Sequence, residues 1–554
     1  MRREVGGRLI GLESPLAACR TAPESAACAA VLQRLDDPYY LGDEPALTQA
    51  SGYLDAWRAA PSVYAVAAAR TEDVVAAVDF ARAHNLRLVV KGGGHSYQGT
   101  SSSRDSLLIW TRAMNHIELH EAFVPEGGAG NVAPQPAVTV GAGAIWMSVY
   151  NAVTTRAGRY AQGGGCMTVG VAGIVQSGGF GSFSKAYGTA AAGLLEAEVV
   201  TADGAVRIVN AHSEPDLFWA LKGGGGGGFG VVTRLTLRTR DLPKMFGAAS
   251  GTIRAHTDSA FNRLVSRIVS FYREQLFNSH WGEQIRFRPD NTVGIGMVLQ
   301  GLRREQAEDA WRPLLEWVAE SPRDFAWETP LSVVDVPARH FWDAEVLLRE
   351  APGRIVPDDR RGARLGEFFW AGNRAEAGQF LHGYRSAWLP ASLLEGDRQG
   401  ALADALYAAS RHREVALHVN KGLAGAPPAD IAAARDTAMN PVALDAFALI
   451  IIAAIGPPAF PGIPGAEPDL AAARREAAAV HRAMDEVLRV VPRPGSYVSE
   501  SDFFEADWQQ AFWGINYQRL AGAKRRYDPD GLFFAHHGVG SEEWSEDGFR
   551  RKGA

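Results

Sequence analysis

The chain has 554 residues, which at roughly 150 residues per domain predicts two to four domains and a sizeable core. Its composition, with 47% hydrophobic and 21% charged residues, is that of an ordinary globular protein and excludes a disordered or fibrous chain. A net charge of -6 argues against a sequence-independent nucleic-acid binder, because such a protein needs a strongly basic face. We therefore expect small-molecule partners and no nucleic acid.

Neither a membrane span nor a metal site is expected. The longest apolar stretch, 447–455, is followed by a Gly-Pro-Pro break and is far shorter than the roughly 20 residues that cross a bilayer. We expect it to be a buried strand. The chain has no Cys-x-x-Cys and no His-Glu-x-x-His pattern, so a zinc or hydrolytic metal site has no support.

The three cysteines are Cys19, Cys28 and Cys166. The first two are spaced so that they can close a small disulfide loop, which favours a secreted or periplasmic location. Two unbonded thiols are an equally good interpretation. The basic N-terminus has no apolar core behind it, so no signal peptide is visible and the compartment stays open.

Glycine is the anomaly of the composition. There are 60 glycines, about 11% of the chain against about 7% in average proteins, and the excess lies in a few runs. Such runs mark backbone that approaches a ligand closely.

Regular structure is predicted from about residue 62. The elements of the first half alternate between helices, strands and glycine-rich connections in this order: helix 71–81, strand 86–90, glycine loop 91–99, strand 137–140, helix 145–157, glycine-rich segment 163–188, hairpin 194–210, helix 213–221, six glycines 223–228 and strand 231–239.

The composition changes after residue 242. Longer helical patterns follow at 303–320 and 471–490, with scattered strands between them. A second domain therefore begins near this point. Because helical and strand patterns alternate without a strict βαβ period, we predict an α+β fold.

The glycine run 92–94 follows a strand, and its backbone N–H groups can form a nest for an anion such as a pyrophosphate. It is not the Gly-x-Gly-x-x-Gly that opens a helix, so a Rossmann fold is disfavoured. The glycines of 163–188, separated by small residues, suit a loop laid flat along a planar or phosphorylated cofactor.

Several blocks together resemble one flavoprotein family. They are Gly-Gly-His-Ser-Tyr at 93–97, Gly-Gly-Gly-Cys-x-Thr-Val-Gly at 163–170, Ser-Gly-Gly-x-Gly at 177–181, Tyr-Gly at 187–188, Ala-Asp-Gly at 202–204, and the closing segments 516–520 and 527–533. This combination is similar to the berberine bridge enzyme-like branch of the vanillyl-alcohol oxidase superfamily, whose members carry a PCMH-type FAD-binding domain.

The resemblance implies a domain plan. A PCMH-type FAD-binding domain of two subdomains is expected at 46–241, after an N-terminal extension at 1–45. A substrate domain at 242–490 would cover the flavin with an antiparallel sheet, and 491–554 would return to the FAD-binding domain.

The resemblance also implies FAD held by two covalent bonds. His95 occupies the position that bonds to the flavin 8α-methyl group, and Cys166 the position that bonds to flavin C6. Imidazole and thiolate are nucleophiles suited to this attack. The further residues that the resemblance places at the cofactor are Gly92, Gly93, Gly94, Ser96, Tyr97, Gly99, Gly163, Gly164, Gly165, Thr168, Val169, Gly170, Gly173, Gly178, Gly179, Gly181, Tyr187, Val231, Asn516 and Tyr517.

A flavin oxidase also needs a base for the substrate proton. The segment 497–502 resembles the family motif Tyr-x-Asn-Tyr-x-Asp, with Glu500 in place of the second tyrosine, which is often the base. Glu500 at the flavin face could take the proton directly, and burial would make it more basic. A surface acid is the alternative.

Three more residues are catalytic candidates. His418 and Asn420 are expected to share one face of a strand over 415–420, because strand side chains alternate. A histidine that only packs in the strand is the alternative at 418. Tyr517 has a family counterpart close to the flavin, and the small Val169 resembles the oxygen-access residue of oxidases.

The function predicted from the sequence is an FAD-dependent oxidase. Its substrate would be an alcohol or a hemiacetal, for example a carbohydrate or an aromatic alcohol. The substrate would transfer a hydride to flavin N5, and O2 would accept the electrons to give H2O2. The alternatives are a dehydrogenase of the same fold with another acceptor, and a flavin-containing binding protein without turnover. A monomer or small homo-oligomer is expected.

Overall fold

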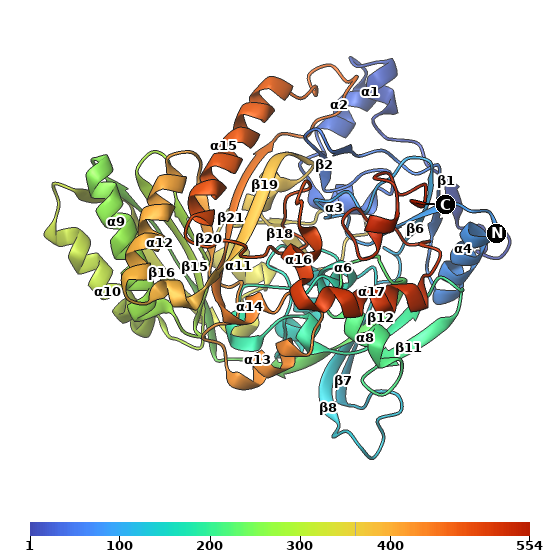
Figure 1. The fold of residues 1–554 in the computed structure, drawn as a ribbon, viewed down its shortest axis with the longest axis horizontal. Coiled ribbons are helices and arrows are strands. Elements are labelled where there is room, and N and C mark those ends of the chain that lie inside the picture. The colour runs from blue at the N-terminus through green and yellow to red at the C-terminus, as the bar shows by residue number, and fades with distance from the viewer. Residues whose placement is uncertain (361, 554) are drawn as a thin grey trace.

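The computed structural model describes residues 1–360 and 362–553 (Figure 1). The first sheet has the strand order β1 (Leu9–Gly11), β4 (Tyr64–Ala67), β6 (Ser106–Trp110) and β5 (Arg87–Lys91). The last three strands are parallel, and β1 pairs antiparallel with β4. Helix α4 (Thr71–Ala83) packs on this sheet through a buried apolar stripe, so the predicted helix and the strand that follows it are confirmed.

A second, antiparallel sheet completes the part of the chain predicted to bind FAD, residues 46–241, which is called the FAD-binding half below. Its strands, in spatial order, are β11 (Val206–Asn210), β10 (Leu194–Val200), β12 (Val231–Asp241), β8 (Gln135–Gly141) and β7 (Ile117–Phe123), with β9 (Arg159–Ala161) also paired to β12. The predicted hairpin is confirmed, since Glu196 lies opposite Asn210 and Val200 opposite Val206. The predicted helix 145–157 is divided into α5 (Trp146–Tyr150) and a wider π-helical turn, η1 (Asn151–Arg156).

A third sheet has nine strands. In spatial order they are β16 (Phe325–Pro337), β13 (Met245–Ala255), β15 (Thr292–Gln300), β14 (Trp281–Phe287), β20 (Val415–His418), β21 (Ala446–Gly456), β19 (Gln379–Pro390), β2 (Ala50–Tyr53) and β3 (Trp57–Arg58). All neighbours are antiparallel except β19 and β2. The apolar run 447–455 lies in β21 and is largely buried, as expected.

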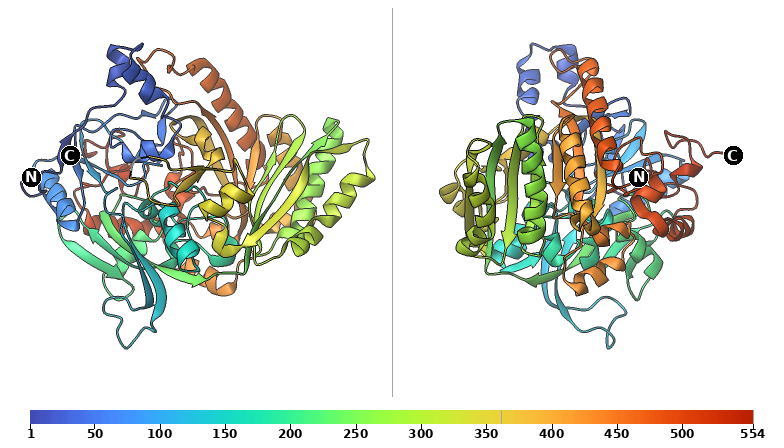
Figure 2. Two further views of the ribbon diagram at one scale, coloured as in Figure 1. Left: turned by 180° about the vertical axis from the view of Figure 1, so that it is seen from behind. Right: turned by 60° about the vertical axis from the view of Figure 1, so that its left-hand side comes forward.

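Four helices cover one face of the nine-stranded sheet: α9 (Asp258–Phe271), α10 (Arg304–Glu320), α12 (Asp397–Ser410) and α15 (Leu470–Leu488) (Figures 1 and 2). Their apolar stripes and the sheet residues beneath them form one core. The glycine-rich segment of the FAD-binding half lies against the opposite face, where Lys185 Nζ donates to the carbonyls of Gly422 and Phe447 at 3.2 and 3.0 Å.

Segments near both ends of the chain pack against the part of the fold that lies far from them in sequence. Strands β2 and β3, which belong to the segment predicted to open the FAD-binding domain, extend the nine-stranded sheet. Helices α16 (Trp508–Trp513) and α17 (Tyr517–Tyr527) return to the FAD-binding half (Figure 1).

The N-terminal extension contains a disulfide. Cys19 of α1 (Ala17–Thr21) is bonded to Cys28 of α2 (Ala26–Leu32), which decides between the two interpretations of this pair. Within the described residues, no helix has both the length and the apolarity to cross a membrane.

Candidate functional site

Two glycine-rich loops are in backbone contact at the centre of the site. The loop after β5 approaches the loop after β9 so closely that a Cβ at Gly93 would lie 2.7 Å from the Gly170 nitrogen and 2.9 Å from the Thr168 carbonyl oxygen. Gly94, with φ +76°, adopts a conformation that favours glycine. The glycines at these positions therefore serve backbone contact rather than chain flexibility.

This contact brings the two predicted flavin anchors together. His95 Nε2 and the Thr168 hydroxyl share a hydrogen bond of 3.0 Å. Thr168 also hydrogen-bonds to Cys166 through both its backbone and its side chain. One threonine thus contacts both nucleophiles, although they are 71 residues apart in the sequence.

Burial sets the protonation of both anchors. It lowers the pKa of His95 to about 4, so the imidazole is neutral at pH 7 and keeps a free lone pair. Burial, with the charge of Glu376 as a smaller cause, raises the pKa of the Cys166 thiol to about 12. The hydrogen bonds with Thr168 lower this pKa, but by less than burial raises it. The thiol therefore needs a proton acceptor before it can act as a thiolate nucleophile.

The loop that carries Cys166 is held from two sides. Gly163 lies on the ring of Trp146, where any Cβ would clash. Tyr150 donates from its hydroxyl to the Gly164 carbonyl at 2.8 Å. A loop held in this way keeps the Cys166 thiol in one position, as attack on a single atom of a bound cofactor requires.

Glu500 lies in an ion pair. Lys421 Nζ contacts its two carboxylate oxygens at 2.6 and 2.5 Å, and the side chains are 10% and 21% exposed, respectively. Glu500 is therefore not a free surface acid.

His418 and Asn420 are only partly as predicted. His418 is the last residue of β20, and burial lowers its pKa well below 6.5, helped by the charges of Lys421 and Arg286. The expectation of a strand through residue 420 is wrong, because the chain turns after His418 and strand alternation no longer applies. Asn420 Nδ2 donates to the Gly181 carbonyl at 3.2 Å, while its buried Oδ1 has no hydrogen-bond partner among the described residues. A bound group with a donor would satisfy that oxygen.

Two tyrosines flank this group. The rings of Tyr97 and Tyr384 are 5.1 Å apart. Burial raises the pKa of each well above 10, and the charges of Glu376 and Glu500 raise it further. Both are therefore neutral phenols at pH 7. Tyr384 lies outside every motif of the resemblance, so the sequence gives no signal for it.

Two glutamates also lie outside the motifs. Glu283 of β14 accepts a hydrogen bond from the Ser182 hydroxyl, and burial raises the pKa of its carboxyl. Burial likewise raises the pKa of Glu376, which accepts from Asn373 Nδ2 at 3.3 Å. The electrostatic influence of Glu500 extends to both carboxyl groups.

Tyr517 and Asn516 contact other parts of the chain. The Tyr517 hydroxyl donates to Glu542 and accepts from the Gly540 N–H at 3.2 Å. Asn516 Nδ2 donates to the Met439 carbonyl at 2.7 Å. In the described part of the chain neither side chain hydrogen-bonds to the anchors or to Glu500, so their roles stay predictions.

The other predicted cofactor residues surround the same loops. Gly179 donates its N–H to the Tyr497 hydroxyl at 3.3 Å, and Gly173 faces open space. The Ser96 hydroxyl accepts from the Thr100 N–H at 3.1 Å. Val231 is buried, and the Tyr187 ring lies 4.6 Å from that of Tyr160.

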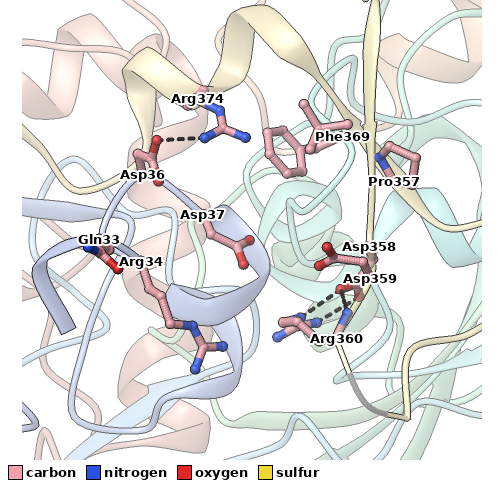
Figure 3. A pocket seen from close by; sticks show the side chains of 11 residues that line it. Gln33, Arg34, Asp36, Asp37, Pro357, Asp358, Asp359, Arg360, Phe369 and Arg374 are labelled. Atoms are coloured by element: carbon pink, nitrogen blue, oxygen red, sulfur yellow. Dashed lines mark hydrogen bonds and ion pairs between the residues drawn. The ribbon is translucent and has the colours of Figure 1, made fainter. Parts of the chain in front are cut away.

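A pocket of about 490 Å³ lies elsewhere (Figure 3). Two pairs of its charged side chains contact each other, Arg360 with Asp358 and Arg374 with Asp36, the latter at 2.8 Å between Nη1 and Oδ2. Phe369 of β18 (Phe368–Trp370) lines it, whereas the next residue, Trp370, donates from Nε1 to the Gly165 carbonyl at 3.2 Å. Successive strand side chains point to opposite faces, so β18 separates this pocket from the Cys166 loop.

Comparisons with known proteins identify the family of this chain. A family model described as FAD binding domain matches residues 62–210, and one described as Berberine and berberine like matches residues 496–540. The FAD-linked oxidoreductase easE of Arthroderma otae is 30% identical over 518 residues, which cover 88% of this chain and 74% of that protein. The easE protein of Arthroderma benhamiae is 32% identical over 508 residues, covering 88% and 90% of the two chains.

Solved structures show the same fold. The VAO-type flavoprotein MtVAO713 from Myceliophthora thermophila C1 superposes with a TM-score of 0.78 at 20% identity, covering 100% of this chain and 95% of that one. A xylooligosaccharide oxidase from the same organism, in complex with xylobiose, gives 0.63 at 18% identity and covers 95% and 99%. An Acremonium strictum glucooligosaccharide oxidase, described as revealing a novel flavinylation, gives 0.64 at 18% identity and covers 93% and 97%.

The chain therefore belongs to the FAD-linked oxidoreductases of the berberine-like family. Its fold is that of the VAO-type flavoproteins. The predicted family, the α+β fold, the FAD-binding domain and the oxidoreductase class are confirmed. The residues present fit FAD, because two glycine loops and two nucleophiles lie together, and a nearby buried amide oxygen, that of Asn420, has no partner within the described part of the chain.

Proposed function

We propose that this chain holds FAD through covalent bonds from both His95 and Cys166 and works as an oxidase of alcohols or hemiacetals, with O2 as acceptor and H2O2 as product. The observation that supports the proposal is that the Thr168 side chain contacts both proposed anchors, the neutral imidazole of His95 and the thiol of Cys166. A structural neighbour described by its novel flavinylation adds support.

Bound FAD supplies a hydride acceptor at its N5 atom. The chain has to hold the substrate and take its hydroxyl proton, for which the candidate from the sequence is the Glu500 carboxylate, oriented by Lys421. His418 is uncharged, since its pKa lies well below 6.5, and so offers a neutral hydrogen-bonding group. The unpartnered Asn420 Oδ1 can accept a hydrogen bond from the bound ligand.

Two sets of observations bear on substrate and acceptor. The neighbours named xylooligosaccharide oxidase and glucooligosaccharide oxidase favour a carbohydrate hemiacetal. Val169, with a small side chain next to the Thr168 contact, is the proposed point of oxygen access; Tyr517 and Asn516 are proposed to support the cofactor. The Cys19–Cys28 disulfide favours an oxidising compartment.

The experiment has two parts. Purified protein is precipitated with acid, and flavin should stay on the polypeptide in the wild type and in each of His95→Ala and Cys166→Ala, but leave it in the double variant. Flavin in the wild-type supernatant would contradict covalent attachment.

The second part measures turnover on a panel of oligosaccharides and aromatic alcohols, with oxygen uptake and peroxide as readouts. Oxygen uptake matched by peroxide is expected. Flavin that is bleached by a substrate but stays reduced in air would identify a dehydrogenase instead. Flavin that no panel member bleaches would favour a binding protein without turnover.

A further inference from the structure

Glu283 has an unusual backbone conformation for a strand residue. Its φ is +67°, in the left-handed region that L-residues other than glycine rarely adopt. It lies within β14, where Trp281, Ile285 and Phe287 are buried in the core under the helices. By strand alternation Glu283 belongs to that same core face.

The positive φ turns the carboxylate to the other face. Ser182 lies there, since its carbonyl lies where a Cβ at Gly282 would point, and the Ser182 hydroxyl donates to Glu283 Oε1. Backbone strain of this kind persists only where the surrounding structure holds it, and it clusters at functional sites. The strain here brings a carboxylate out of an apolar core and onto the cofactor-binding half.

Glu283 and Glu500 have different partners. Lys421 pairs with Glu500 at 2.6 and 2.5 Å. Within the described residues, Glu283 has no cation at salt-bridge distance and one side-chain hydrogen bond, from a neutral hydroxyl. Burial raises the pKa of Glu283, the charge of Glu500 adds to this, and the charges of Lys421 and Arg286 oppose it. When two carboxylates have environments that differ in this way, they take different roles in proton transfer.

Glu283 also lies next to the cysteine anchor. A Cβ at Gly165, the residue before Cys166, would be 3.4 Å from both Glu283 Oε1 and Ser182 Oγ. Under the proposed function Cys166 bonds to flavin C6, and C6 and N5 are attached to the same ring carbon. A group beside Cys166 is therefore beside the atom that receives the hydride.

We propose that Glu283 is the catalytic base of the oxidation and that the Glu500–Lys421 pair positions the substrate. The substrate O–H bond breaks and its proton passes to the Glu283 carboxylate, while the adjacent C–H bond breaks and its hydrogen leaves as hydride, with both electrons, to flavin N5. The carbon becomes a carbonyl. Bound FAD would then pass the hydrogen received at N5, with its two electrons, to O2, and the proton held by Glu283 would complete H2O2 and restore the carboxylate. This assignment rests on the proposed attachment of Cys166 to the flavin.

The placement is tested with sulfite, which adds to flavin N5 and needs no known substrate. Removing a negative charge beside N5 in Glu283→Gln should lower the sulfite Kd by at least about tenfold at neutral pH. The control is Glu320→Gln, an exposed glutamate at the end of α10, which should leave the Kd unchanged. A Glu283→Gln value within twofold of the wild type would overturn the placement.

The role is tested by anaerobic flavin reduction with the best substrate of the panel. Glu283→Gln should slow reduction by at least about a hundredfold, with substrate affinity little changed, and should remove the acidic limb of the pH profile. Glu500→Gln should weaken substrate binding and keep that limb. The opposite pattern would make Glu500 the base and overturn the proposal.

Two checks keep these results interpretable. Glu283→Asp retains a carboxylate, so it should keep flavin content and part of the reduction rate. Equal loss in Glu283→Asp and Glu283→Gln, with normal flavin content in both, would also overturn the role as base. If Cys166→Ala binds flavin as the wild type does and the wild type carries only the His95 bond, the proposed function itself fails, and this is visible before any Glu283 variant is made.

Discussion

The backbone strain at Glu283 gives a prediction about stability that needs no substrate. Two variants, Glu283→Gly and Glu283→Ala, both remove the carboxylate and its hydrogen bond with Ser182. These losses cancel when the two variants are compared with each other. What differs is the backbone, because alanine at φ +67° keeps the strain and glycine does not.

The magnitude follows from two opposing terms. The left-handed conformation costs alanine roughly 1–2 kcal/mol, whereas glycine loses more backbone freedom on folding, which costs about 0.5–1 kcal/mol. Taking the middle of each range, Glu283→Gly should therefore be the more stable variant by about 0.75 kcal/mol. The matched control is Glu328 of β16, an exposed strand residue of the same sheet outside the set of positive-φ positions. There the order should reverse, with Glu328→Ala the more stable variant.

The assay is thermal unfolding of the four variants at equal flavin content. The rank order of Tm within each pair is the readout, since a chain of this size need not unfold in two states. An alanine variant at 283 as stable as the glycine variant would refute the argument that strain is stored at this residue.

Three other predictions concern different parts of the molecule. Thr168→Val removes the hydroxyl shared by the anchors and should slow covalent flavin attachment about tenfold, whereas Thr168→Ser should not; the measurement is acid-precipitable flavin against time. Lys524→Met breaks a buried pair with Asp528, of 2.6 Å, and should cost about 3 kcal/mol or more, seen as a lower Tm. The exposed-pair control, Arg304→Met, should leave Tm nearly unchanged, and equal losses would contradict this reasoning. Burial lowers the pKa of His537 to about 3, so the unfolded chain binds more protons and stability falls as the pH drops below about 6.5. His537→Asn, which tolerates the φ of +49°, should lose less Tm between about pH 7 and pH 5, and an unchanged loss would refute this cause.

The FAD-binding half was predictable because its signals are local. Where two backbones are in contact, as at Gly93 and Gly170, only glycine fits. The glycines at such positions are therefore visible in the sequence. The proposed anchors His95 and Cys166 lie within these glycine-rich motifs, so the motif that identifies the loop also identifies the residue.

The substrate half was predictable only in outline. Its sheet joins β14 to β20 and β19 to β2, pairs separated by more than 100 residues, and no local pattern encodes such a register. Lys421 meets Glu500 across 79 residues for the same reason. Glu283 escapes prediction altogether, since alternation places it in the core and only the tertiary structure reveals its positive φ.

Double attachment of FAD is tested most directly by proteolysis of the purified protein followed by mass spectrometry of the flavin-bearing material. The peptide containing His95 and the peptide containing Cys166 should be recovered joined through a single flavin. In Cys166→Ala the flavin should remain on the His95 peptide alone, and in His95→Ala on the Cys166 peptide alone. Recovery of both wild-type peptides unmodified, with free FAD in solution, would contradict the assignment of His95 and Cys166 as flavin anchors.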